Sequence, residues 1–107
     1  MKQYVSVDEF ARDLPGIAAQ MQDKLQGNDG SFCLKLKDGR NYSVELKDGL
    51  ATVSKTENAA AECTVTADDK ALLDMINGKL SPVKALLFGK VSVKGDVMKL
   101  KKLMSLL

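Results

Sequence analysis

The stretch that decides the fold is residues 31–55, SFCLKLKDGRNYSVELKDGLATVSK. Apolar and polar residues alternate over 31–37 and again over 41–47, so one set of side chains faces a core and the other faces water. The tripeptide Lys-Asp-Gly stands at 37–39 and again at 47–49, and Asp-Gly supplies the positive φ that tight hairpin turns need. This pattern predicts three strands, over 31–37, 41–47 and 50–55.

The residues before the strands predict a helical region. Ser6 with Glu9 three positions later is typical of a capping box. Pro15 interrupts the apolar run, so we expect either a kink or two consecutive helices. The apolar side chains that recur at helical spacing are Phe10, Leu14, Ile17, Met21 and Leu25.

The residues after the third strand first extend the strand pattern and then change period. Residues 61–66 predict a fourth strand, which we expect to continue the meander. The remaining elements are a helix over 68–77, a short helix that begins at Ser81-Pro82 and ends at Gly89, a strand over 91–94 and a last helix over 97–107. Residues 1–107 therefore form a single α+β domain, and its one-faced sheet must be covered by helices.

Composition agrees with one globular domain. The chain has 107 residues, of which 45% are hydrophobic and 28% charged. Aromatic residues make up only 5% and Trp is absent, so the interior must consist of Leu, Val, Ala, Ile and Met. Such side chains are adaptable. They suit a cavity for an apolar ligand, and they equally suit an ordinary core.

The sequence lacks the residues of most catalytic and cofactor sites. Without His there is no Ser-His-Asp or Cys-His catalysis and no His-ligated metal. Cys33 and Cys63 are too far apart in sequence for a zinc motif, and we expect two free thiols in a reducing cytosol. No phosphate-binding glycine motif occurs. We therefore expect no enzyme, no cofactor and no metal; an enzyme with an unrecognised Asp/Lys site is the least favoured reading.

The charge distribution bears on partners. Residues 79–107 hold seven lysines and one acid, a net charge of +6, so residues 1–78 carry −4. This asymmetry could orient the protein on an anionic membrane through its basic C-terminal region, or it could be a solvated helix face with lysines at strand edges. Lysines outnumber arginines fourteen to two without interleaved aromatics, so no nucleic-acid partner is expected. With no signal peptide and no membrane-spanning run, we expect a cytoplasmic protein.

The segment from Ala61 to Leu106 resembles the sterol carrier protein type 2 family. The similarity is strongest between Gly78 and Gly95, where turn residues recur at the family's offsets: Gly78, Lys79, Leu80, Ser81, Pro82, Ala85, Gly89, Lys90, Val91, Val93, Lys94 and Gly95. The resemblance implies a twisted, five-stranded, mostly antiparallel sheet, covered on one face by helices and enclosing a hydrophobic tunnel. It also implies carriage of sterols, fatty acids, fatty acyl-CoA or phospholipids without altering them.

Two of the departures from the family pattern bear on function. Phe88 stands where the family often has a polar residue, so the resemblance implies no headgroup anchor there. Ser105-Leu106-Leu107 lacks the basic middle residue of a peroxisomal address, so we expect a stand-alone bacterial protein.

Residues 80–88 carry more apolar side chains than the single stripe of a short helix. The residues alone leave two readings open: the surplus faces a lipid, or it is sandwiched between the sheet and the last helix. The resemblance favours a lipid. The expected lining is Phe32, Leu34, Val44, Leu72, Met75, Ile76, Leu80, Val83, Leu86, Leu87, Phe88, Leu100, Leu103 and Met104.

The expected function is therefore non-catalytic binding and intracellular carriage of lipids. Burying an acyl chain contributes roughly 0.8 kcal/mol per CH₂, so a long chain binds without polar contacts and the site is permissive. The alternative is a structural or interaction module that acts as accessory subunit to a lipid-metabolising enzyme, its tunnel filled by its own side chains.

Overall fold

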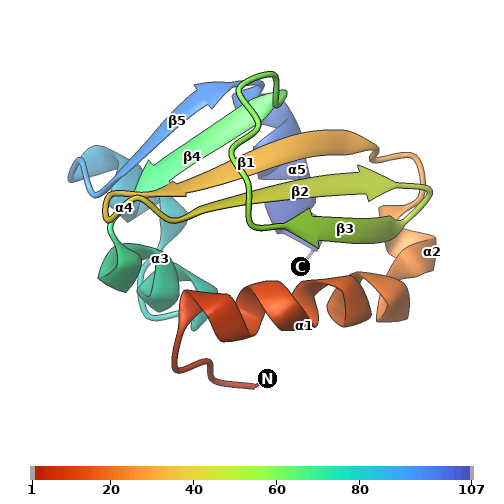
Figure 1. Cartoon of the computed structure of the whole chain (residues 1–107), viewed down its shortest axis with the longest axis horizontal. Coiled ribbons are helices and arrows are strands. Elements are labelled where there is room, and N and C mark those ends of the chain that lie inside the picture. Colours follow the sequence, from red (N-terminus) through yellow and green to blue (C-terminus); the bar gives the residue numbers. More distant parts are fainter. Residues whose placement is uncertain (1, 107) are drawn as a thin grey trace.

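The computed structural model describes residues 2–106, with side chains up to residue 102. Its strands form one five-stranded sheet in the order β3-β2-β1-β4-β5, and its helices cover one face of that sheet (Figure 1). The elements along the chain are α1 (Val7–Gln20), α2 (Gln22–Leu25), β1 (Gly30–Leu36), β2 (Asn41–Lys47), β3 (Leu50–Ser54), β4 (Cys63–Ala67), α3 (Asp69–Ile76), α4 (Pro82–Leu87), β5 (Val91–Gly95) and α5 (Val97–Leu106).

The first three strands form the predicted hairpins, but the predicted four-strand meander is wrong at β4. Strand β4 pairs in parallel with β1, whereas the β1–β2, β2–β3 and β4–β5 pairs are antiparallel. The polar segment 55–62 carries the chain back across β1 (Figure 1). The side chains of Cys63, Val65 and Ala67 in β4 are buried. They are buried because β4 lies beside the central strand β1, under the helices. Alternation therefore identified the strand but not its partner.

The crossing segment also explains the burial of Cys33. In the alternation of residues 31–37, Cys33 belongs to the set predicted to face water. It does lie on the face opposite the helices, yet it is 0% exposed. The segment is tied down over this face because the Ser43 hydroxyl donates to the Thr56 carbonyl and the Glu62 N–H donates to the Ser31 hydroxyl. Cys33 is therefore shielded from water although no helix covers this face.

Helix α1 begins at the predicted cap, but the junction between the two consecutive helices lies at Met21 and not at Pro15. The Ser6 hydroxyl accepts a hydrogen bond from the Glu9 N–H at 3.1 Å, which caps the first turn. The helix continues through Pro15 and ends at Met21, from which the short α2 follows. Pro15 is exposed, so its ring points to solvent. Proline removes one backbone hydrogen bond from α1. Burial of Val7, Ala11 and Ala18 on the inner face of the helix stabilises it enough to offset that loss.

Arg40 connects three elements at one end of the sheet. Its guanidinium donates to Asp38 in the β1–β2 turn at 2.7 Å and to Asp69 at the start of α3, and lies 3.7 Å from Asp8 of α1. Hydrogen bonding to Asp38 raises the pKa of Arg40, and the same contact lowers the pKa of Asp38. A carboxyl with a lowered pKa contributes stability above its unfolded pKa, about 3.9, and that stability is lost as pH falls through the folded pKa.

Arg40→Ala is therefore expected to lower the free energy of unfolding modestly, since exposed ion pairs contribute less than about 1 kcal/mol each. The difference in free energy of unfolding between the parent and this variant should shrink in high salt, which screens the ion pairs. It should also shrink at acidic pH, where Asp38 is protonated even in the parent protein. Urea denaturation at several pH values measures it, with Lys37→Ala in the same turn as the control. Equal stability of the two variants at neutral pH and low salt would contradict this role.

Candidate functional site

The helix-covered face of the sheet carries a core that is not completely closed. Phe32 and Tyr42 are buried there, together with Leu72 of α3. Around them, other apolar side chains pack against the core but remain only partly buried: Met21, Leu34, Val44, Ala51, Val53, Leu73, Met75, Ile76, Leu80, Val93 and Leu100. These side chains come from the sheet and from α3 and α5, among other elements. Each of them keeps some exposed apolar surface that a ligand could cover.

The structure brings together eight of the fourteen residues predicted to line a lipid site. Phe32 and Leu72 lie in the core itself. Six more are partly buried against it: Leu34, Val44, Met75, Ile76, Leu80 and Leu100. The side chains of Leu103 and Met104 lie outside the described residues.

The other four predicted residues face the solvent. In α4 the side chain of Ala85 is fully buried, and the apolar side chains around it point away from the protein. The exposed fractions are 66% for Val83, 45% for Leu86, 76% for Leu87 and 69% for Phe88. These four apolar side chains therefore neither pack between the sheet and α5 nor face the core.

Five of the partly buried apolar residues were not predicted from the sequence as lining: Met21, Ala51, Val53, Leu73 and Val93. Val53 of β3 lies opposite Val44, and Val93 of β5 lies opposite Val65. Both share the covered face, and both are partly buried against the core. The alternation in 50–55 and 91–94 carried this signal, because residues that pair across strands share one face of the sheet.

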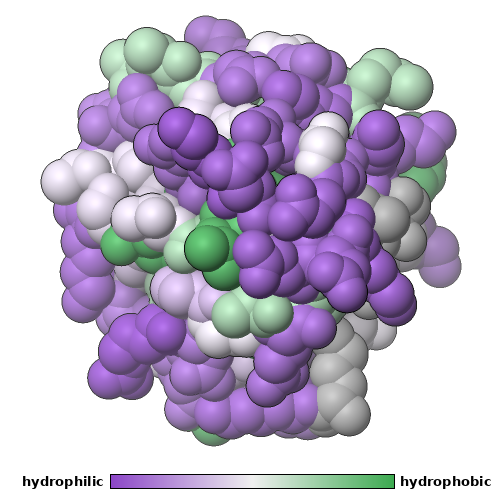
Figure 2. Space-filling model, turned by 90° about the vertical axis from the view of Figure 1, so that its right-hand side faces the viewer, coloured by the Kyte–Doolittle hydropathy of each residue, from purple (hydrophilic) through white to green (hydrophobic). Residues whose placement is uncertain are grey.

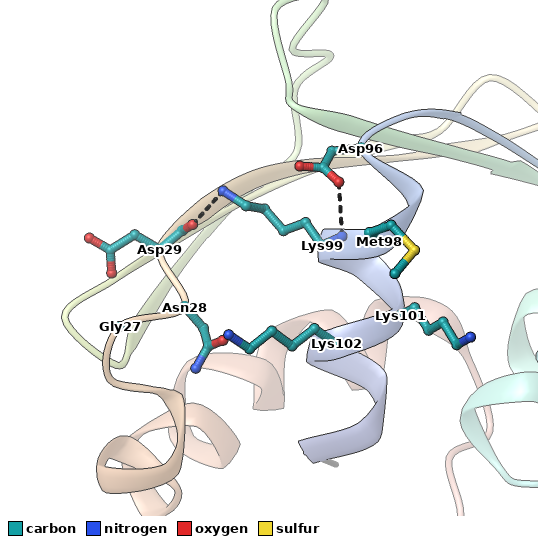
Figure 3. Close-up of a pocket in the computed structure, with 8 residues that line it drawn as sticks. All are labelled: Gly27, Asn28, Asp29, Asp96, Met98, Lys99, Lys101 and Lys102. Carbon is teal, nitrogen blue, oxygen red and sulfur yellow. Dashed lines mark hydrogen bonds between the residues drawn. The ribbon is translucent and has the colours of Figure 1, made fainter.

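An open hollow of about 600 Å³ lies between the 27–29 loop and α5 (Figure 3). The Lys99 side chain reaches from α5 to the loop, where its ammonium donates to the Asp29 carbonyl at 2.8 Å and to the Glu62 carboxylate. Asp96 caps α5 by accepting from the Lys99 N–H at 2.9 Å. None of the described residues around this hollow is on the predicted lining: Gly27, Asn28, Asp29, Asp96, Met98, Lys99, Lys101 and Lys102. Lys99 therefore fastens α5 to the 27–29 loop beside this hollow.

Comparison with known proteins identifies the family. Residues 11–107 match the model of the SCP-2 sterol transfer family. The chain belongs to this family. It is 30% identical over 105 residues to sterol carrier protein 2 of Bos taurus, covering 86% of this chain and 19% of that protein. For sterol carrier protein 2 of Gallus gallus the identity is 33% over 101 residues, covering 90% and 18%. The chain thus spans about a fifth of the length of these relatives.

Solved SCP-2 structures have the same fold. Sterol carrier protein 2 of Yarrowia lipolytica in its apo form aligns with a TM-score of 0.63 at 25% identity, covering 95% of this chain and 96% of that one. Palmitated SCP2L2 of Aedes aegypti aligns with a TM-score of 0.75 at 24% identity, covering 94% and 93%. The sec-alkylsulfatase Pisa1 from Pseudomonas sp. aligns with a TM-score of 0.74 at 27% identity, covering 80% of this chain and 14% of that one. The predicted five-stranded, mostly antiparallel α+β fold is confirmed.

The described part of this SCP-2 domain shows no metal-binding cluster of His, Cys, Asp or Glu. Within residues 2–106 no helix combines the length and apolarity needed to cross a bilayer. The Cys63 thiol is fully buried on the helix-covered face, and burial, with the nearby Asp96 carboxylate, raises its pKa. A thiol in this environment is a poor nucleophile.

Both thiols of the folded protein are expected to react slowly with Ellman's reagent, since each is fully buried. Access requires opening of the structure, so the rate should be at least about a hundredfold below that of the urea-unfolded chain. The absorbance of the released thionitrobenzoate measures this rate. Prompt reaction of one thiol per chain without denaturant would contradict the burial described here.

Proposed function

We propose that this chain binds lipids with long apolar chains between the helix-covered face of its sheet and helices α3 and α5. The observation that carries the proposal is the set of apolar side chains on this face that pack against the core yet stay partly accessible, among them Leu34, Val44, Val93 and Leu100. An acyl chain or sterol that covered them would complete the core. Membership of a sterol transfer family supports the same ligand class.

The chemistry of this face favours apolar over polar recognition. Apart from the hydroxyls of Tyr4 and Tyr42 and the two cysteine thiols, no polar or charged side chain among the described residues is buried. Binding would therefore derive from the removal of CH₂ groups from water, roughly 0.8 kcal/mol for each. Such a site would select ligands by length and volume and would accept several lipid classes.

The proposed role is carriage without chemical change. The proposed lining holds no nucleophile and no acid–base pair, and the nearby Cys63 thiol is kept protonated by its raised pKa. Lipid esters and thioesters incubated with the pure protein should be recovered intact. Two free cysteines fit a reducing compartment, so we place the carrier in the cytoplasm.

A matched pair of variants on β2 tests the site. Val44 lies on the covered face between Phe32 and Val53, and its neighbour Glu45 is exposed on the other face. Val44→Phe should fill space that about two methylenes of the ligand would occupy, which weakens fatty-acid binding roughly tenfold. Glu45→Phe adds the same ring outside the site and should leave binding unchanged.

Titration with a fluorescent fatty acid gives both dissociation constants, and circular dichroism checks that both variants fold. Equal affinity of the two variants would place the ligand elsewhere. Unchanged binding by Val44→Phe together with weakened binding by Glu45→Phe would place it on the opposite face of the sheet.

A second candidate function is an accessory module of a lipid-metabolising enzyme. It is favoured by one observation: the domain matches only 14% of the Pseudomonas sulfatase chain and 18–19% of the curated relatives above, so it also occurs inside larger proteins. An apo protein that takes up no lipid probe and forms a stable complex in cells would support the module over the carrier.

A further inference from the structure

Helix α4 displays an exposed apolar patch, the α4 patch, formed by Val83, Leu86, Leu87 and Phe88. Successive helix residues are separated by about 100°, so Val83 and Leu87 lie almost opposite the buried Ala85, with Leu86 and Lys84 on the two flanks. A surface helix normally turns its apolar stripe inward. This helix buries the small Ala85 and exposes three large apolar residues, and its C-cap residue Phe88 is a fourth.

Lysines surround the α4 patch. Residues 79–95 contain four lysines and no acid. Lys79, Lys84 and Lys90 are exposed, and none of the ion pairs among the described side chains involves them. Lys99 of α5 differs, because it is engaged by Glu62 and Asp29. Other exposed lysines, such as Lys37 and Lys47, are followed directly by an aspartate, whereas the lysines beside the exposed apolar side chains lie in a segment without any acid.

The patch occupies one end of the molecule. In Figure 1 helix α4 lies at the left end, beside the start of β5 and above α3. Figure 2 shows the opposite end, whose surface is mostly hydrophilic, with hydrophobic residues at its centre and further ones near its upper edge. The molecule therefore has one end suited to an apolar surface and another suited to water.

We propose that residues 79–90 form a docking element for bilayers that contain anionic lipid. Val83, Leu87 and Phe88 would enter the acyl boundary, while Lys79, Lys84 and Lys90 would lie at the level of the headgroups. An apolar face bordered by lysines is typical of interfacial helices, and long lysine side chains reach the headgroups while their stems remain apolar. Protein–protein interfaces are depleted in lysine, which disfavours a protein partner for this surface.

This inference deepens the proposed function, since docking would bring the lipid site to a membrane, and it can be tested separately. The measurement is flotation of the protein with phosphatidylcholine vesicles that contain or lack phosphatidylserine. The double variant Leu87→Ser/Phe88→Ser should bind the anionic vesicles at least about tenfold more weakly than the parent. Met98→Ser, which removes an equally exposed apolar side chain from α5, should bind like the parent.

A second pair of variants tests the charge. Lys84→Gln should weaken binding to anionic vesicles about fivefold, and added salt should weaken the parent likewise. Lys37→Gln, at an exposed and equally unpaired position in the β1–β2 turn, should have little effect. Equal losses for the two variants would indicate attraction by net charge alone and would overturn the proposal.

Three further results would also overturn it: parent-like flotation of the double variant, loss of flotation in Met98→Ser, or a parent dimer that the double variant abolishes. A soluble fatty-acid assay without vesicles separates docking from ligand binding. The double variant should take up fatty acid normally, and loss of uptake would assign the α4 patch to the ligand site instead. A parent that floats with vesicles but takes up no lipid would sustain docking and refute the carrier.

Discussion

Palmitate is expected to bind this protein on the order of a thousandfold more tightly than decanoate. The two ligands share a carboxylate and differ by six methylenes. Each methylene buried in an apolar site contributes roughly 0.8 kcal/mol, which sums to about 5 kcal/mol if the whole difference is buried. The partly accessible side chains on the helix-covered face supply the apolar surface for this burial.

Isothermal titration calorimetry of saturated fatty acids below their critical micelle concentrations measures this dependence. The heat-capacity change of binding should be negative and should grow with chain length, since apolar burial produces it. Methyl palmitate should bind about as well as palmitate, because no Lys or Arg among the described residues is buried to pair with the carboxylate. Affinity independent of chain length would show that the headgroup, and therefore a polar site, controls binding.

Gly95→Ala is expected to destabilise the fold by about 2–5 kcal/mol. Gly95 has a φ of 96°, and an added Cβ would lie 2.2 Å from the Glu62 carbonyl oxygen. This carbonyl also accepts the Asp96 N–H at 2.8 Å, so the clash falls where β4 and β5 pair and where α5 begins. Backbone on both sides of the contact leaves little room for relaxation.

Gly89→Ala separates the clash from the backbone strain. Gly89 also has a positive φ, 68°, but an added Cβ there meets nothing within 4 Å. This control should cost only about 1 kcal/mol. Thermal and urea denaturation measure both variants. Similar losses for the two would show that the close approach of Gly95 to Glu62 does not constrain this end of the sheet.

The local elements could be predicted because neighbouring residues determine them. The Lys-Asp-Gly turns adopt the expected positive φ at Gly39 and Gly49, and the strands on each side pair in hairpins. Ser6, Asp96 and the Ser81-Pro82 pair begin helices as their types predict. The caps at Ser6 and Asp96 depend on a side chain and a backbone N–H three positions apart, and the hairpin turns depend on the positive φ of glycine. Helix α4 begins with proline at its first position and has no side-chain cap from Ser81.

The features that could not be predicted depend on tertiary contacts. The pairing of β4 with β1 and the burial of Cys33 both follow from the path of the 55–62 segment, which no local pattern encodes. Helix α1 continues through Pro15 because its inner face is packed, and propensity alone does not report packing. For the lipid site, the sequence identified apolar residues but could not separate those on the covered face from the four that α4 exposes. Which of them contact a ligand stays a prediction.

The most direct test of lipid carriage is native mass spectrometry of the gently purified protein, followed by solvent extraction and identification of any adduct. A lipid bound at one per chain, and replaced by fatty acid or acyl-CoA when these are added, is the predicted result. A bare mass that stays bare when fatty acid, acyl-CoA and sterol are offered would contradict the account, and would leave the interaction module as the function of this domain.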